Sequence, residues 1–116
     1  SFHNQLDAFL DFLIKEHPED NQFATFKNFI KNARKINSIQ VIKKLMDYLE
    51  PHKEKIYKED EKFFLEYDFG THGDEAGEHS IHLKDIYINC NDDNIKKQLW
   101  QYVQVLLKLG EKCNIN

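Results

Sequence analysis

Apolar residues recur at helical spacing along most of this chain, and this periodicity constrains the fold more than any other feature. In residues 2–17 the apolar positions are Phe2, Leu6, Phe9, Leu10, Leu13 and Ile14. Because residues three or four apart share one face of an α-helix, the spacing predicts an amphipathic helix there. The same reasoning predicts helices over residues 18–36, 38–49, 52–66 (in one piece or two) and 92–109. We therefore expect an all-α, single-domain bundle of about five helices.

The expected helix boundaries follow from residues that start or stop helices. Pro18 is predicted to open the second helix, because proline is tolerated at a first helical position. Asn37 or Ser38 is predicted to cap the third helix with a side-chain oxygen. The last helix is expected to begin after a cap in the Asn-Asp-Asp run at 91–93. It is expected to stop at Gly110, a residue type common at helix C-termini.

One segment breaks the helical pattern. Residues 67–90 are expected to form an irregular, Gly/His-rich loop before the last helix, because they hold three of the four glycines. Within this segment, residues 81–88 fit a short strand and a helical turn equally well. The whole chain, residues 1–116, is expected to form one domain.

Composition excludes several classes of protein. The chain has 116 residues, of which 41% are hydrophobic and 13% aromatic, enough to build a core and too many for a disordered chain. It holds no run of about 20 apolar residues, so no membrane span is expected. Two cysteines do not make a disulfide framework, and no signal peptide is recognisable, so a reducing, intracellular location is expected.

Charge is strongly segregated along the sequence. Residues 21–46 carry six bases and no acid, whereas residues 47–78 carry four bases and eleven acids. The six bases are Lys27, Lys31, Arg34, Lys35, Lys43 and Lys44. They form a candidate nucleic-acid-binding face. The alternative, which the acidic net charge of −4 favours, is that residues 47–78 fold against this face and neutralise it.

A further candidate site is the loop that contains His72, His79, His82 and Cys90. Imidazole and thiolate groups bind transition metals, and His79 and His82 are spaced to lie on one side of a turn. The pattern matches no established ligand spacing such as CxxC or HExxH. A polar surface loop is therefore the favoured interpretation, and no cofactor is expected.

Two aromatic residues fall off the apolar stripes of their helices. Phe12 and Trp100 are therefore candidate anchors for a protein partner, since large aromatic side chains dominate many protein–protein contacts. A neighbouring helix or the long loop could instead cover either residue. No arrangement of nucleophile, base or phosphate-binding glycines indicates catalysis, so the chain is not expected to be an enzyme.

Three stretches of the sequence are distinctive when taken together. They are HPEDNQFATFKNFI at 17–30, YLEPHKEKIYKEDEKFFLEYD at 48–68 and IKKQLWQYVQVLLKLG at 95–110. Their order resembles a group of short α-helical proteins encoded by nucleocytoplasmic large DNA viruses, the giant viruses. The resemblance implies a location in the host cytoplasm or the virion. It implies no activity and carries over no catalytic residue.

Together these features predict a non-enzymatic α-helical protein–protein interaction module of viral origin. Self-association as a homodimer is the simplest form of such a module, because most soluble assemblies are homo-oligomers. Two alternatives stay open: nucleic-acid association through the basic residues of 27–44, and metal binding through residues 72–90.

Overall fold

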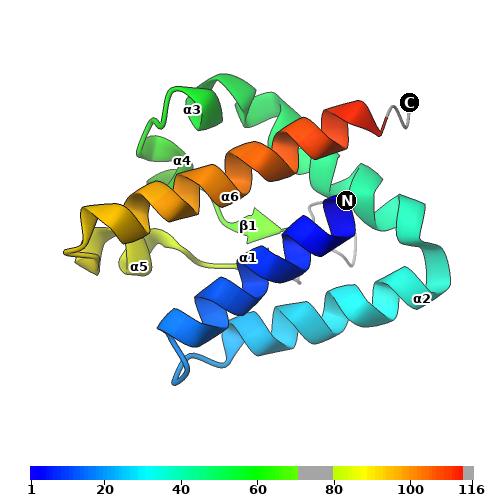
Figure 1. Cartoon of the computed structure of the whole chain (residues 1–116), viewed down its shortest axis with the longest axis horizontal. Coiled ribbons are helices and arrows are strands. Elements are labelled where there is room, and N and C mark those ends of the chain that lie inside the picture. The colour runs from blue at the N-terminus through cyan, green and yellow to red at the C-terminus, as the bar shows by residue number, and fades with distance from the viewer. Residues whose placement is uncertain (71–79, 114–116) are drawn as a thin grey trace.

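The computed structural model describes residues 1–70 and 80–113, and within these ranges almost every element is a helix (Figure 1). The first helix, α1 (Phe2–Glu16), begins after Ser1, whose hydroxyl accepts a hydrogen bond from the Asn4 backbone N–H at 3.2 Å. The apolar face of α1 is buried, as its spacing predicts. The predicted all-α class is confirmed.

The second helix, α2 (Gln22–Leu49), begins four residues later than the sequence predicts. Pro18 lies instead in a turn, in which the Asp20 N–H donates to the His17 carbonyl oxygen at 3.1 Å. The Asp20 carboxylate then accepts from the Gln22 N–H at 3.1 Å, which satisfies a donor that the first helical turn leaves open. The prediction that Pro18 starts the helix is wrong, because Pro18 lies in a turn and the N-cap residue of α2 is Asn21.

Three short pieces follow α2. They are a 3-10 turn, η1 (Glu50–His52), and two helices, α3 (Lys53–Tyr57) and α4 (Lys62–Glu66). The break between α3 and α4 is a Schellman motif around Glu59, whose φ of 55° is left-handed. The Glu59 N–H donates to the Ile56 oxygen at 3.2 Å, and the Asp60 N–H donates to the Lys55 oxygen at 2.9 Å. The predicted 52–66 helix is therefore present in two pieces.

The segment expected to be irregular holds more order than predicted. It contains two strands and a helix: β1 (Phe69–Gly70), β2 (Ser80–Ile81) and α5 (Lys84–Asn89). The strands pair antiparallel, with Phe69 opposite Ile81. Residues 81–88 therefore include both the end of a strand and most of a helix. Phe69 and Ile81 are 1% and 0% exposed, so this short pair belongs to the core.

The last helix, α6 (Asp93–Lys112), begins after Asp92, whose side chain accepts from the Asn94 N–H at 2.8 Å, as predicted. The prediction that Gly110 stops this helix is wrong, since the helix continues past it. Gly110 is buried against Met46 of α2, and a Cβ atom at Gly110 would fall 2.1 Å from Met46 Sδ. The glycine therefore allows α6 to approach α2 closely.

The helices pack around one continuous apolar core. α1 packs against α6 and α2, and its contact with α6 is the most extensive between any two elements. Figure 1 shows α1 and the first half of α2 on one side of α6, with α3 and α4 on the other. Among the helices that the structure describes, none combines the length and apolarity that crossing a membrane requires.

Candidate functional site

The α2 helix is bent in its middle. Asn37 has φ −160° and ψ 98°, outside the helical region, and its side chain accepts a hydrogen bond from the Gln40 N–H at 3.1 Å. This is an N-cap for the second half of the helix, at one of the two positions that the sequence predicts. Polar residues occupy positions 37 and 40, where the buried stripe of the first half would continue, and burial resumes at Val41.

Two isoleucines flank the bend and face solvent. Ile36 is 88% exposed and Ile39 is 58% exposed. Ile36 also lines an apolar pocket of about 200 Å³, together with Phe29, Ala33 and Val41. Single exposed apolar residues are common on proteins, but one that also borders an apolar pocket marks a candidate contact surface. Ile39 lies just beyond the bend and does not line this pocket. We call Ile36, Ile39 and this pocket the bend patch.

Replacing Asn37 with alanine is expected to lower the free energy of unfolding by about 1 kcal/mol, because the Gln40 N–H loses its side-chain acceptor. Urea unfolding followed by far-ultraviolet circular dichroism measures the change. Ser38→Ala is the matched control at the adjacent exposed position. Equal losses in the two variants would contradict a capping role for Asn37.

Two of the six bases predicted as a nucleic-acid face are used inside the fold. Arg34 donates hydrogen bonds of 2.9 Å to both carboxylate oxygens of Asp7, and Lys27 pairs with Asp11. Both acids lie on α1, against which α2 packs. The prediction that residues 47–78 neutralise the basic segment is therefore wrong for Arg34 and Lys27. Their acidic partners lie on α1 instead.

His3 lies beside the Arg34 side chain. A guanidinium nitrogen of Arg34 donates to the His3 carbonyl oxygen at 3.3 Å. Burial of the His3 ring, reinforced by the charge of Arg34, holds the pKa of His3 below its usual value of 6.5. His3 is therefore neutral at neutral pH and adds no positive charge to this part of the surface.

Three of the remaining bases stay in solvent. Lys31, Lys35 and Lys43 are exposed, and none of them forms an ion pair within residues 1–70 and 80–113. Lys35 is adjacent to Ile36 in the chain, Lys31 lies one turn before Lys35, and Lys43 lies one turn after Ile39. We call these three lysines, which are close to the bend in sequence but do not line the pocket, the basic rim.

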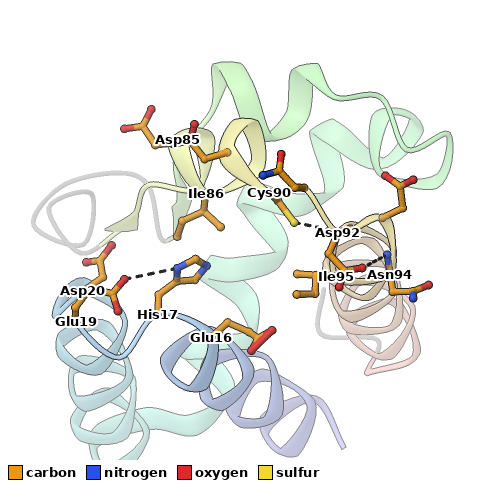
Figure 2. A pocket seen from close by; sticks show the side chains of 13 residues that line it. Glu16, His17, Glu19, Asp20, Asp85, Ile86, Cys90, Asp92, Asn94 and Ile95 are labelled. Atoms are coloured by element: carbon orange, nitrogen blue, oxygen red, sulfur yellow. Dashed lines mark hydrogen bonds and ion pairs between the residues drawn. The ribbon is translucent and has the colours of Figure 1, made fainter.

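A second hollow, of about 810 Å³, is lined by acids (Figure 2). It lies between the end of α1, the turn that leads to α2, the helix α5 and the start of α6. Its acidic lining residues are Glu16, Glu19, Asp20, Asp85, Asp92 and Asp93. The lining residues that the structure describes include no lysine and no arginine. We call this feature the acidic hollow.

The acidic hollow has an apolar floor. Figure 2 shows Ile86 and Ile95 turned toward its middle, with carboxylates around them. Asp92 caps α6, and Asp20, which precedes the N-cap residue of α2, accepts a hydrogen bond from the Gln22 backbone N–H. Glu16 accepts no side-chain hydrogen bond from any residue in the described part of the chain. The hollow therefore gathers six carboxylates, one of which, that of Glu19, lies 4.0 Å from His17 Nδ1.

Trp100 packs in the core and is not an exposed anchor. It is 3% exposed, and its ring centroid lies 4.4 Å from that of Phe64 of α4. Its Nε1 donates to the hydroxyl oxygen of Tyr87 of α5 at 3.4 Å. The prediction that Trp100 contacts a partner is wrong, because α4 and α5 cover it. Phe12 is half-buried, with its ring centroid 5.1 Å from that of Tyr102, and a partner contact there stays a prediction.

The predicted metal site is only partly within the described residues. His72 and His79 lie outside them. Among residues 1–70 and 80–113, no three His, Cys, Asp or Glu side chains are grouped closely enough to hold a metal ion. Metal binding by the loop therefore stays a prediction that rests on the sequence alone.

The other two predicted ligands each have a different neighbour. The Nδ1 atom of His82 lies 2.8 Å from the Asp68 carboxylate. The Sγ atom of Cys90 donates to the Asp92 backbone oxygen at 3.3 Å. His82 and Cys90 thus interact with separate residues.

The chain matches no protein-family model, and comparisons with curated proteins and with solved structures find no match. Its function is therefore inferred from its own surfaces. The bend patch with its basic rim and the acidic hollow are the two surfaces whose chemistry is most distinctive.

Proposed function

We propose that this chain is a non-enzymatic protein–protein interaction module that binds its partner through the bend patch. The observation that carries the proposal is Ile36, which is 88% exposed and lines an apolar pocket. Association would remove this apolar area from water, which is the main favourable contribution to most protein–protein contacts. The pocket would receive an apolar side chain of the partner.

The basic rim supports a partner that carries acids around that apolar side chain. Lys31, Lys35 and Lys43 are exposed on the two halves of the bent helix, and residues 21–46 hold no acid. Charge complementarity of this kind speeds encounter and excludes wrong partners more than it adds affinity. The apolar centre would thus supply most of the affinity, and the charged residues would select the partner.

The same surface suits a protein better than a nucleic acid. Arg34 and Lys27, two of the six bases, are already paired with acids of α1. The most exposed residue of the patch, Ile36, is aliphatic, and it offers neither a stacking ring for a base nor a donor for a phosphate. Nucleic-acid association through the basic residues of 27–44 stays the alternative.

The viral context remains what the sequence resemblance implies. A location in the host cytoplasm or the virion would mean that the partner is found there. The proposed contact through the bend patch does not depend on that location. The half-buried Phe12 is a second candidate contact.

Site-specific photo-crosslinking tests the proposal. A photo-reactive amino acid at Gln40, which lines the pocket, is expected to capture a protein partner in extract of the cells that make this chain naturally. Ile36→Asp in the same protein is expected to weaken binding by about thirtyfold, equivalent to a hot spot of about 2 kcal/mol, and so to remove the adduct. Because Ile36 is exposed, this change leaves the fold intact.

The control places the photo-reactive residue at Gln101, an exposed position on α6. Adducts that form equally from positions 40 and 101, or that persist with Ile36→Asp, would show that the bend patch is not the binding surface. The mass of the adduct identifies the captured protein, including a second copy of this chain.

A further inference from the structure

The pocket of the bend patch lies between the two halves of one helix. Its described lining residues all belong to α2, and they come from both sides of the bend at Asn37. Phe29 and Ile36 belong to the first half of the helix, and Gln40 and Val41 belong to the second. A change in the angle between the two halves would therefore change the shape of the pocket.

His3, in the first turn of α1, contacts α2 on both sides of this bend. A guanidinium nitrogen of Arg34, three residues before Asn37, donates to the His3 carbonyl oxygen at 3.3 Å. The His3 ring interacts with the backbone of Ser38, the residue directly after Asn37. A change in the charge of this ring therefore acts at the bend itself.

The surroundings of the His3 ring suit its neutral form. The Nδ1 atom is buried and has no hydrogen-bond partner among the described residues. A neutral ring can carry its one proton on Nε2, which leaves only a lone pair at the buried nitrogen. A protonated ring carries an N–H on both nitrogens, and a buried donor without an acceptor is costly. The packed contact therefore disfavours the charged ring.

The charges around the ring act in the same direction. Burial of the ring, followed by the charge of Arg34 on α2, lowers the pKa of His3 below 6.5. The Ser38 backbone and Asp7 on α1 oppose this shift, but both Asp7 carboxylate oxygens already accept from Arg34 at 2.9 Å. Among the described residues, α6, which also packs against α1, adds no charged group that shifts this pKa.

We propose that His3 makes the bend of α2 sensitive to pH, because protonation of its ring separates the first turn of α1 from Ser38 and changes the pocket of the bend patch. Separation places the charged ring in water, where its charge is solvated. The Arg34–Asp7 pair keeps the next turn of α1 on α2, so the change is local. Its bearing on partner binding rests on the proposed function, whereas the contact itself belongs to the chain without a partner.

The direction of the pH dependence follows from the two environments of the ring. In water the pKa of His3 is near 6.5, and in the packed contact it is lower. The open form therefore binds more protons, so the contact is fully formed above about pH 6.5 and weakens as the pH falls below that value. Between about pH 7.5 and about pH 5.5, the opening equilibrium can rise by at most about tenfold, because a ring in water is then about ten times more often charged than neutral.

Amide hydrogen exchange of the pure chain at these two pH values measures the opening. Each exchange rate is divided by the intrinsic rate of an unprotected amide at the same pH. The Gln5 N–H, which donates to the Ser1 carbonyl oxygen at 3.0 Å, and the Gln40 N–H report on the two sides of the contact. Their corrected rates are expected to rise at the lower pH, by up to about tenfold. Corrected rates that do not change overturn the proposal.

His3→Gln assigns the effect to this ring, because glutamine does not titrate in this range. The variant is expected to lose the rise at both amides, whereas His17→Gln, at the other end of α1, is expected to keep it. Equal pH dependence in His3→Gln and the original chain overturns the proposal. If His3→Gln does not fold, nuclear magnetic resonance titration of the His3 ring in the original chain decides. A pKa below 6.5 is expected, and a pKa of 6.5 or above overturns the proposal.

Photo-crosslinking from position 40 at the two pH values tests the link to the pocket. Capture of the partner is expected to fall at the lower pH when residue 3 is His and to persist with His3→Gln. Equal capture at both pH values overturns this link. The two proposals fail separately. Capture at the higher pH that depends on Ile36, with hydrogen exchange that ignores pH, overturns only the pH-sensitive bend. Exchange that responds to pH through His3, with no Ile36-dependent capture, overturns only the interaction module.

Discussion

Trp100→Ala is expected to lower the free energy of unfolding by about 3–5 kcal/mol, the usual cost of truncating a buried tryptophan. Trp100 is 3% exposed and sits between α4 and α5, with Phe63, Phe64 and Tyr87 around its ring. The variant loses these ring contacts and leaves a cavity at the junction of three helices. Since small domains are stable by only about 5–15 kcal/mol, a large share of the stability is at stake.

Urea unfolding followed by far-ultraviolet circular dichroism measures this loss, because the variant lacks the tryptophan fluorescence. Gln101→Ala is the control on the same helix at an exposed position. Trp100→Phe is expected to lose less than Trp100→Ala, since a ring is kept against Phe64. A loss for Trp100→Ala no larger than that of the control would mean that α4 and α5 do not cover this side chain.

Phe69→Ala is the second substitution with a large expected effect, again about 3–5 kcal/mol. Phe69 is 1% exposed, and its ring makes edge contacts with Phe9, Phe26 and Tyr48 at centroid distances of 5.3, 6.5 and 5.7 Å. A residue of a two-residue strand thus joins α1 to both halves of α2. Its removal withdraws packing from all three at once.

Ile36→Ala is the control for Phe69→Ala, since it also truncates a large apolar residue but at an exposed position. Its free energy of unfolding is expected to change little, whereas its association through the bend patch is expected to weaken. If the two variants were destabilised equally, Phe69 would not occupy the centre of the core. Thermal unfolding of both proteins at the same concentration and salt makes the comparison.

The helical class and the cap at Asn37 could be predicted because both depend on local signals. Helical spacing of apolar residues marks a buried face, and a side-chain oxygen three residues before a backbone N–H marks a cap. Pro18 and Gly110 were misleading because their effects depend on neighbours. The turn after His17 moves the start of α2 to Gln22, and Met46 explains the glycine in α6.

The burial of Trp100 and Phe69 could not be predicted from periodicity. Trp100 lies off the best stripe of its helix, and only the packing of α4 and α5 gives it a buried environment. Phe69 lies in a glycine-rich stretch without helical spacing, so no local pattern indicates its place in the core. Tertiary contacts decide both positions.

The candidate site likewise combines features that local sequence signals predict with features that only tertiary packing creates. Charge segregation predicted a basic segment, and three of its lysines are exposed near the bend of α2. Ile36 and Ile39 stand on either side of the predicted cap, and their exposure depends on the bend at Asn37. The acidic hollow gave no such signal, because it joins residues 16–20 to residues 85–95, which are far apart in the sequence.

The extensive contact between α1 and α6 has a consequence for biosynthesis. α1 is made early, yet its largest packing partner is the helix over residues 93–112. During translation the apolar face of α1 must therefore wait for nearly the whole domain before its main partner emerges from the ribosome. Until then α1 can pack mainly against α2, so the native core is completed late in synthesis.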